Sequence, residues 1–241
     1  MFTGIVEQTG TLVGLEERGA ASGGVRRITV EAPGIAGRLH EGDSLAVSGV
    51  CLTALDVNPR YFYADLARET LEKTSLGRLA AGAKVNLELP TAAGSPLGGH
   101  VVQGHVDGTG VLTALEPLVP RSRPDFDEKT TDWTLKVRVP ETVRQWMVPK
   151  GSVAIEGISL TIAEWDGELV TVAILPLTYW RTNLHTLQTG APVNVEGDVL
   201  VKLAVERMRN ATPTLSANDA ERMGHPKETE LTEAWLVERG Y

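Results

Sequence analysis

The chain has 241 residues, of which 42% are hydrophobic and 22% charged, and its formal net charge at pH 7 is −8. This length allows one large or two small domains with proper cores. Because lysine and arginine form no cluster and no apolar run approaches the roughly 20 residues of a membrane span, the composition argues against nucleic-acid binding, anionic-membrane binding and membrane insertion.

The first residues, MFTGIVEQTG, lack the basic and apolar regions of a signal peptide. The single cysteine, Cys51, cannot form an internal disulfide, so nothing favours secretion. We therefore predict a cytoplasmic protein.

Short apolar segments separated by glycine predict β-strands in the first half of the chain. RRITVEA (26–32) alternates between apolar and polar residues, and DSLAVSGVCLTAL (43–55) is an apolar run interrupted by glycine. A short helix is predicted at ETLEKTSLGRL (69–79), followed by a strand at KVNLEL (84–89).

The second half repeats this order of elements. Strands are predicted at TLKVRVP (134–140), GSVAIEGISLTIAEW (151–165) and PVNVEG (192–197), with a short helix at TYWRTNLHTL (178–187). The segment EPLVPRSRPDFDEK (116–129) is rich in proline and charge and is predicted to be a loop.

The last predicted elements are helical. DVLVKLAVERMRN (198–210) has apolar residues at helical spacing, at Val201, Ala204, Val205 and Met208, and such a face needs a partner, which copies of the helix in other subunits would supply. The polar tail from 211 to 241 contains a second possible helix at ELTEAWLVERG (230–240).

The two halves are copies of one unit. A shift of 108 residues aligns 42–90 with 150–198 without a gap, and fourteen of the 49 positions are identical. A shift of 100 residues aligns 4–12 with 104–112, with five of nine positions identical. We therefore predict two related domains, 1–97 and 98–200, followed by 201–241, and an all-β fold in which each copy closes into a small barrel.

The repeated phrases SGVCLT (48–53) and EGISLT (156–161) differ at the reactive atom, which is the thiol of Cys51 in the first copy and the hydroxyl of Ser159 in the second. A lone cysteine is most often a small buried hydrophobe. The alternative is that two related pockets share one scaffold and perform different tasks.

The glycine-rich segment LGGHVVQGHVDGTG (97–110) carries His100 and His105. On a continuous strand their spacing of five sends them to opposite faces, so we expect no shared metal site, and with one cysteine in the chain a zinc site is not predicted. The glycines match no nucleotide-binding motif. His105 aligns with Ile5 of the first copy and is either a structural histidine or a functional group specific to this place.

Two further positions have both a structural and a functional reading. Asp198 stands just before the predicted helix, where a carboxylate is most often an N-cap. Lys150 aligns with Gly42 and is either a solvated lysine or a binding residue.

Together these segments resemble riboflavin synthases of the alpha-subunit type. The resemblance covers about residues 1–209 and rests on MFTGIVE (1–7), SLAVSGVCLT (44–53), ETLEKTSLGRLAAGAKVNLE (69–88), LGGHVVQGHVDGTG (97–110) and KGSVAIEGISLT (150–161). It implies two tandem six-stranded Greek-key β-barrels, a C-terminal trimerisation helix, and a homotrimer with its active site between the first barrel of one subunit and the second barrel of a neighbour. The implied reaction needs no cofactor or metal: two molecules of 6,7-dimethyl-8-ribityllumazine exchange a four-carbon unit and give riboflavin and 5-amino-6-ribitylaminopyrimidinedione. Lumazine synthase is a candidate partner.

Carried over by position, the resemblance implies catalytic roles for Ser44, Cys51 and His105 in the first barrel and for Asp198 from the second. It places first-barrel pteridine contacts at Gly4, Ile5, Val6, Thr53, Asp65, Leu66, Ala67, Arg68, Glu69 and Thr70. It places second-barrel contacts at Lys150, Ser159, Thr161, Leu175, Pro176, Leu177, Thr178, Tyr179 and Trp180. Further contacts are expected at Leu52, Leu160, Gly104 and Val106.

The chain departs from the family pattern in the second copy. LPLTYW (175–180) replaces a segment that usually reads IPHT or IPET, Leu203 stands where a tyrosine is common, and the loop and tail are longer than the family needs. Two other functions therefore stay open: a non-catalytic lumazine- or flavin-binding protein of the antenna type, and a synthase-derived enzyme that acts on a modified pteridine.

Overall fold

The computed structural model describes residues 1–18 and 24–211. Residues Met1–Val205 form one compact unit, and a second unit begins at Glu206. Among the described residues, none of the helices combines the length and apolar character that a transmembrane segment requires.

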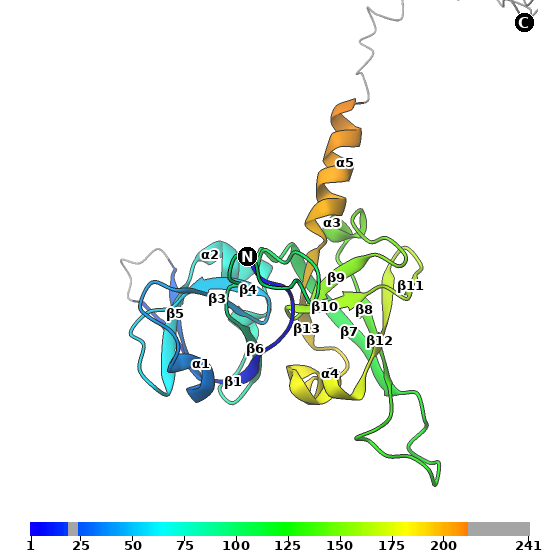
Figure 1. Ribbon diagram of the computed structural model, residues 1–241, viewed down its shortest axis with the longest axis horizontal. Coiled ribbons are helices and arrows are strands. Elements are labelled where there is room, and N and C mark those ends of the chain that lie inside the picture. The colour runs from blue at the N-terminus through cyan, green and yellow to red at the C-terminus, as the bar shows by residue number, and fades with distance from the viewer. Residues whose placement is uncertain (19–23, 212–241) are drawn as a thin grey trace, which may run out of the picture. The chain divides into compact units, whose positions relative to one another are not determined.

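The first half forms a six-stranded antiparallel sheet, at the left of Figure 1. Its strands are β1 (Gln8–Glu17), β2 (Arg26–Glu31), β3 (Ser44–Val47), β4 (Val50–Thr53), β5 (Tyr61–Leu66) and β6 (Lys84–Glu88). They lie in the order β4-β3-β6-β1-β2-β5, and the two edge strands contact each other, so the sheet curls into a barrel around its own apolar core. The strong alternation of β2 and β5 follows from this closure, because every second side chain enters the core.

The second half repeats this sheet, at the right of Figure 1. Its strands are β7 (Gly108–Pro117), β8 (Trp133–Arg138), β9 (Ser152–Ile155), β10 (Ile158–Thr161), β11 (Glu164–Trp165), β12 (Leu169–Ile174) and β13 (Pro192–Gly197). The order is β10-β9-β13-β7-β8-β12-β11, so six strands match the first sheet and the two-residue β11 is added at the edge. The predicted all-β fold with two barrels is confirmed.

In the described part of the chain, five α-helices accompany the sheets. They are α1 (Pro33–Ala36), α2 (Arg68–Lys73), α3 (Glu141–Arg144), α4 (Pro176–Arg181) and α5 (Val199–Ala211). The helices predicted near 69–79 and 178–187 are α2 and α4, each followed by a separate 3₁₀ turn. In both α2 and α4 a threonine follows the last helical residue. Its hydroxyl donates to the carbonyl four residues earlier, from Thr74 to Thr70 at 2.6 Å and from Thr182 to Thr178 at 2.7 Å. This local bond competes with continuation of the helix.

A buried polar network joins the two barrels. The side chains of Asn86 and Asn194, which are equivalent in the repeat, cross to the opposite barrel: Asn86 donates to the carbonyl of Glu156 at 2.9 Å, and Asn194 donates to that of Ser48 at 2.9 Å. Glu156 is fully buried, and its carboxylate accepts the backbone N–H of Asn194 at 2.7 Å and the side-chain amide of Asn183 at 2.8 Å. Because the two asparagine side chains find their partners across the interface, they hold the two barrels in one register.

The long loop between β7 and β8 packs against α4, although the two features are far apart in the chain. The indole N–H of Trp180 donates to the carbonyl of Glu128 at 3.1 Å. Tyr179 stacks on Trp133, the first residue of β8, with ring centroids 3.9 Å apart. The added loop and the bulky aromatic residues of LPLTYW therefore form one structural feature.

The helix predicted at 198–210 is α5, and Asp198 caps it by accepting the backbone N–H of Leu200 at 2.8 Å. The side chains of Leu200 and Leu203 are 65% and 55% exposed. The possible helix at 230–240 lies outside the described residues.

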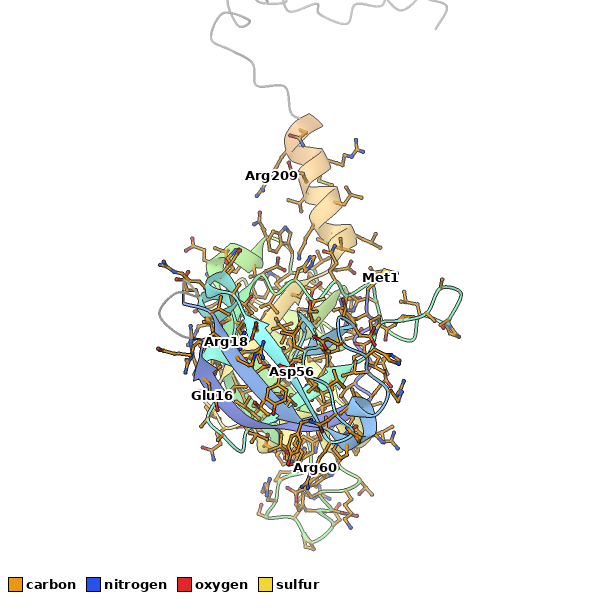
Figure 2. The ribbon with its side chains drawn as sticks, turned by 90° about the vertical axis from the view of Figure 1, so that its left-hand side faces the viewer. Met1, Glu16, Arg18, Asp56, Arg60 and Arg209 are labelled. Carbon is orange, nitrogen blue, oxygen red and sulfur yellow. The ribbon has the colours of Figure 1, made fainter. Side chains whose placement is uncertain are left out.

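Charged residues cover the outer face of the first barrel, which is turned toward the viewer in Figure 2. There Arg27 binds Asp65 and Asp56, each at 2.6 Å, and Arg18 lies 4.0 Å from Asp65. Hydrogen bonding from Arg27 lowers the pKa of Asp65. None of these four residues lines either of the two pockets described below.

Candidate functional site

The chain segment that precedes each barrel packs against the other barrel, so the two segments are exchanged. Phe2 and Val102 form an antiparallel bridge, with N–H···O distances of 2.8 and 3.1 Å, and the N-terminus lies between the two barrels in Figure 1. Beyond this bridge, residues 4–6 pack against the second barrel and residues 104–106 pack against the first. Each pocket is therefore built from both halves of the chain.

The first pocket has a volume of about 510 Å³, within the usual range for small-molecule sites. It lies between β4, α2 and the segment that precedes β7. Its lining residues are Val50, Cys51, Ala67, Glu69, Thr70, Lys73, Thr74, Gly104, His105, Val106, Asp107 and Trp146.

Cys51 and His105 share this pocket. The backbone N–H of Cys51 donates to the carbonyl of Gly104 at 2.8 Å, which places the next residue, His105, beside the thiol-bearing strand. Gly104 has a φ of +80°, and a Cβ there would lie 2.6 Å from the Cβ of Cys51, so only glycine permits this approach. Cys51 is half-buried and His105 is exposed to the pocket.

The second barrel contributes Trp146 and Asp107 to the wall of the first pocket. Lys202 of α5 lies 5.2 Å from the centre of the Trp146 ring and forms an ion pair of 2.7 Å with Asp107. This pair is largely buried, which makes its hydrogen bond stronger than that of a surface pair.

The second pocket has a volume of about 280 Å³ and occupies the equivalent position in the second barrel. Its lining residues are Gly4, Ile5, Val6, Ile158, Ser159, Leu177, Thr178, Arg181 and Thr182. The N–H of Ser159 donates to the carbonyl of Gly4 at 2.8 Å, as that of Cys51 does to Gly104. Cys51 and Ser159 are thus equivalent in space as well as in sequence.

His100 is buried next to Ser159, a lining residue of the second pocket. Its Nδ1 atom lies 2.7 Å from the hydroxyl oxygen of Ser159, and burial lowers its pKa, while the charge of Asp198 opposes this shift. His100 and His105 therefore serve different barrels. The predicted separation of the two histidines is correct, but its cause is the exchange of segments and not strand alternation.

Gly4, Ile5 and Val6, which were expected among the first-barrel pteridine contacts, line the second pocket in this structure. The first pocket receives Gly104, His105 and Val106 instead. The exchange of segments at the bridge between Phe2 and Val102 is the physical reason.

The four expected catalytic residues fall into three places. Cys51 and His105 meet in the first pocket. Ser44 pairs with Thr53 on the same hairpin, but it lines a separate depression with Asp43. Asp198 caps α5 and is not among the residues that line either pocket of this chain, although its charge acts on His100 next to Ser159.

The other expected contacts divide by environment. Ala67, Glu69, Thr70, Gly104 and Val106 line the first pocket, and Ser159, Leu177 and Thr178 line the second. The apolar cores contain Leu52, Leu66, Leu160 and Tyr179. Ion pairs at the surface involve Asp65 and Arg68. The exposed residues are Thr53, Lys150 and Thr161. Leu175, Pro176, Leu177 and Trp180 line an adjoining apolar hollow of about 660 Å³ together with Lys129.

Several pocket residues were missed from the sequence. Lys73 with Thr74 and Arg181 with Thr182 occupy equivalent places in the two pockets, and the repeat could have identified them, because both threonines are identical and both basic residues align. Trp146 carries no such signal, since it reaches the first pocket from the other barrel. Among the described residues, no group of three His, Cys, Asp or Glu side chains is arranged to hold a metal ion.

Comparison with known proteins identifies the two halves. The model of the lumazine binding domain family matches residues 3–90 and 103–198. The riboflavin synthase of Mycobacterium tuberculosis is 40% identical over 216 residues, which cover 88% of this chain and 100% of the relative. That of Bacillus subtilis is 33% identical over 241 residues and covers both chains completely. Among solved structures, LumP in complex with riboflavin shares the fold, with a TM-score of 0.70, 24% identity and coverage of 82% of this chain and 99% of the other.

Proposed function

The chain belongs to the riboflavin synthase family of lumazine-binding-domain proteins, and we propose that it converts two molecules of 6,7-dimethyl-8-ribityllumazine into riboflavin and 5-amino-6-ribitylaminopyrimidinedione. It is an enzyme that transfers a four-carbon unit from one lumazine to the other. The curated relatives named riboflavin synthase, which match nearly the whole chain, support this function.

The observation that carries the proposal is the pair of equivalent but unequal pockets. A dismutation needs two copies of one substrate in two different roles, so it needs two similar sites with different reactive groups. The first pocket combines the thiol of Cys51 with the imidazole of His105, whereas the second has the hydroxyl of Ser159 beside His100.

The proposed chemistry assigns a task to each group. A base must remove a proton from the acidic 7-methyl group of one lumazine, and a nucleophile or a bound water must add to C7 of the other. An imidazole can take up and release a proton, which favours His105 as the base. Cys51 lies in the same pocket and is placed to add to C7 or to orient the water. Glu69, Thr70 and Lys73 supply the polar wall that a ribityl chain requires.

We further propose that the active site forms between subunits of a homotrimer, with the first pocket of one chain facing the second pocket of a neighbour. Two features support this assembly. Leu200 and Leu203 expose apolar surface on α5, which a neighbouring subunit would cover. Asp198 contributes to neither pocket of its own chain, which fits a group that acts across a subunit boundary. We expect the enzyme to work in the cytoplasm, with lumazine synthase as a candidate partner.

The test is incubation of the purified protein with 6,7-dimethyl-8-ribityllumazine and chromatographic analysis of both products. Riboflavin and the pyrimidinedione should appear in equal amounts, with two lumazines consumed for each riboflavin. A protein that binds one lumazine per chain and never forms riboflavin would instead be an antenna-type binder. The altered segment at Leu177 favours this alternative, because one intact pocket suffices for binding.

A further inference from the structure

Each exchanged segment is held by a buried glutamate from the end of a barrel strand. The carboxylate of Glu196, at the end of β13, accepts the backbone N–H groups of Gln103 at 2.7 Å and Gly104 at 3.0 Å. Glu88, at the end of β6, accepts the N–H groups of Thr3 at 2.6 Å and Gly4 at 3.0 Å. Both glutamates are buried, with side chains 2% and 5% exposed respectively.

The Glu196 carboxylate is connected to the reactive groups of the first pocket through one residue. It holds the N–H of Gly104, the carbonyl of Gly104 accepts the N–H of Cys51 at 2.8 Å, and His105 follows directly in the chain. A change in the position of the carboxylate therefore moves His105 relative to Cys51. Glu88 has the same relation to Gly4 and Ser159 in the second pocket, where no imidazole follows the glycine.

A second anchor holds the other side of His105. The carboxylate of Asp107 accepts the N–H of Gly197 at 2.8 Å and pairs with Lys202 at 2.7 Å. The N–H of Asp107 donates to the carbonyl of Val195 at 3.0 Å. His105 is thus the middle of a short span fixed at both ends. The carboxylate and ion-pair contacts of this span come from β13 and α5 of the second barrel, and the N–H of Cys51 in β4 is its contact with the first barrel.

The acceptor must be a carboxylate for both bonds to form, since each of its oxygens takes one N–H. A glutamine would retain one oxygen and turn an NH₂ group toward the other N–H, where no bond can form. The groups that face Glu196 are the two backbone donors, the cation of Lys202 and the like charge of Asp107. Burial raises the pKa of Glu196, while the two N–H bonds and Lys202 favour the ionised form.

We propose that Glu196 is a positioning residue that sets the place of His105 beside Cys51. The proposal rests on the function proposed above, in which His105 moves a proton. Glu196 touches no substrate and acts only through the segment that it holds. Glu88 positions the wall of the second pocket and does not affect His105.

A double-mutant cycle separates positioning from general damage. Glu196→Gln should lower kcat about 10- to 100-fold, since a displacement of about 1 Å can cost this much. In a His105→Ala background the same substitution should change kcat less than twofold, because the group that it positions is absent. Glu88→Gln is the matched control, and its effect should be the same with and without His105. An effect of Glu196→Gln that is equally large in both backgrounds would overturn the proposal.

A measurement that does not depend on catalysis distinguishes the positioning role of Glu196 from the proposed function. In protein labelled with ¹³C-histidine, the Cε1 resonance of His105 should move in Glu196→Gln and stay in place in Glu88→Gln. If the wild type forms no riboflavin, the proposed function fails while this comparison still decides the role of Glu196. Glu196→Asp, which keeps the charge but withdraws both oxygens by one methylene, is the second variant, and it must also shift the His105 resonance. An unmoved resonance in both folded variants would refute the positioning role.

Discussion

The imidazole Nδ1 of His100 lies 2.7 Å from the hydroxyl of Ser159, although the two residues are 59 positions apart in the chain. The other ring nitrogen, Nε2, is buried without a hydrogen-bond partner among the described residues. In a neutral imidazole one nitrogen donates a hydrogen bond and the other accepts one. If Nδ1 of His100 accepts, the hydroxyl of Ser159 donates to the imidazole. If Nδ1 donates, the hydroxyl can donate to a ligand. Cys51, the counterpart of Ser159, shares its pocket with His105.

His100→Phe should weaken lumazine binding to the second pocket about two- to tenfold, because it removes the hydrogen bond that orients Ser159. Fluorescence titration with lumazine measures the loss, and His40→Phe, at an exposed histidine, should leave binding unchanged. In a Ser159→Ala background, His100→Phe should have little further effect. Equal losses with and without the serine hydroxyl would show that His100 does not act through Ser159.

Cys51→Ala and His105→Ala should each reduce kcat for riboflavin formation, by about 10²-fold or more, if the two groups perform the proton transfer and addition assigned to them. Ser159→Ala, which truncates the equivalent residue of the second pocket, should affect the KM for lumazine more than kcat. Steady-state kinetics with product analysis separates these effects. A Cys51→Ala enzyme with the wild-type rate would remove the thiol from the reaction.

The sequence predicted much of this arrangement, for a physical reason that also limits it. Identical residues at fixed shifts correctly indicated two similar barrels and the equivalence of Cys51 and Ser159. They could not show that residues 4–6 and 104–106 exchange barrels, because both copies offer the same pattern of donors and acceptors to either segment. Trp146 was missed for the same reason, since its contact with the first pocket depends on the way the barrels meet.

Glu156→Gln should change the pH dependence of stability. Burial raises the pKa of Glu156 above its ordinary value of 4.5, so the folded state binds this proton more tightly than the unfolded state does. Between the two pKa values the folded state carries more protons, and the free energy of unfolding falls as pH rises through that window. Relative to Glu156→Gln, the wild type should therefore lose stability as pH increases above about 4.5, by at most about 1.4 kcal/mol per pH unit.

Urea unfolding at a series of pH values measures this difference. Glu41→Gln, at an exposed glutamate, is the control and should run parallel to the wild type. A wild type that gains stability over Glu156→Gln with rising pH would contradict the assigned sign.

Tyr179→Ala should destabilise the second barrel by about 3 kcal/mol, because it removes a buried ring that stacks on Trp133. Trp180→Ala should cost only about 1 kcal/mol, since this indole is 41% exposed and loses mainly its bond to Glu128. The second change should nevertheless release the loop between β7 and β8, and limited trypsin digestion should then cleave faster at Arg121 and Lys129. Unchanged digestion would show that the indole does not secure the loop.

Gly104→Ala tests how closely the exchanged segment must approach Cys51. Gly104 and Gly82 both have positive φ, +80° and +91°, so an alanine at either position carries a similar backbone strain of roughly 1 kcal/mol. Only at Gly104 does the new methyl group meet another residue, with Cys51 Cβ at 2.6 Å, whereas nothing lies within 4 Å at Gly82. Gly104→Ala should therefore abolish most riboflavin formation and lower the melting temperature more than Gly82→Ala does, whereas Gly82→Ala should retain activity. Equal activity of the two variants would mean that the contact between Gly104 and Cys51 is not needed for the reaction.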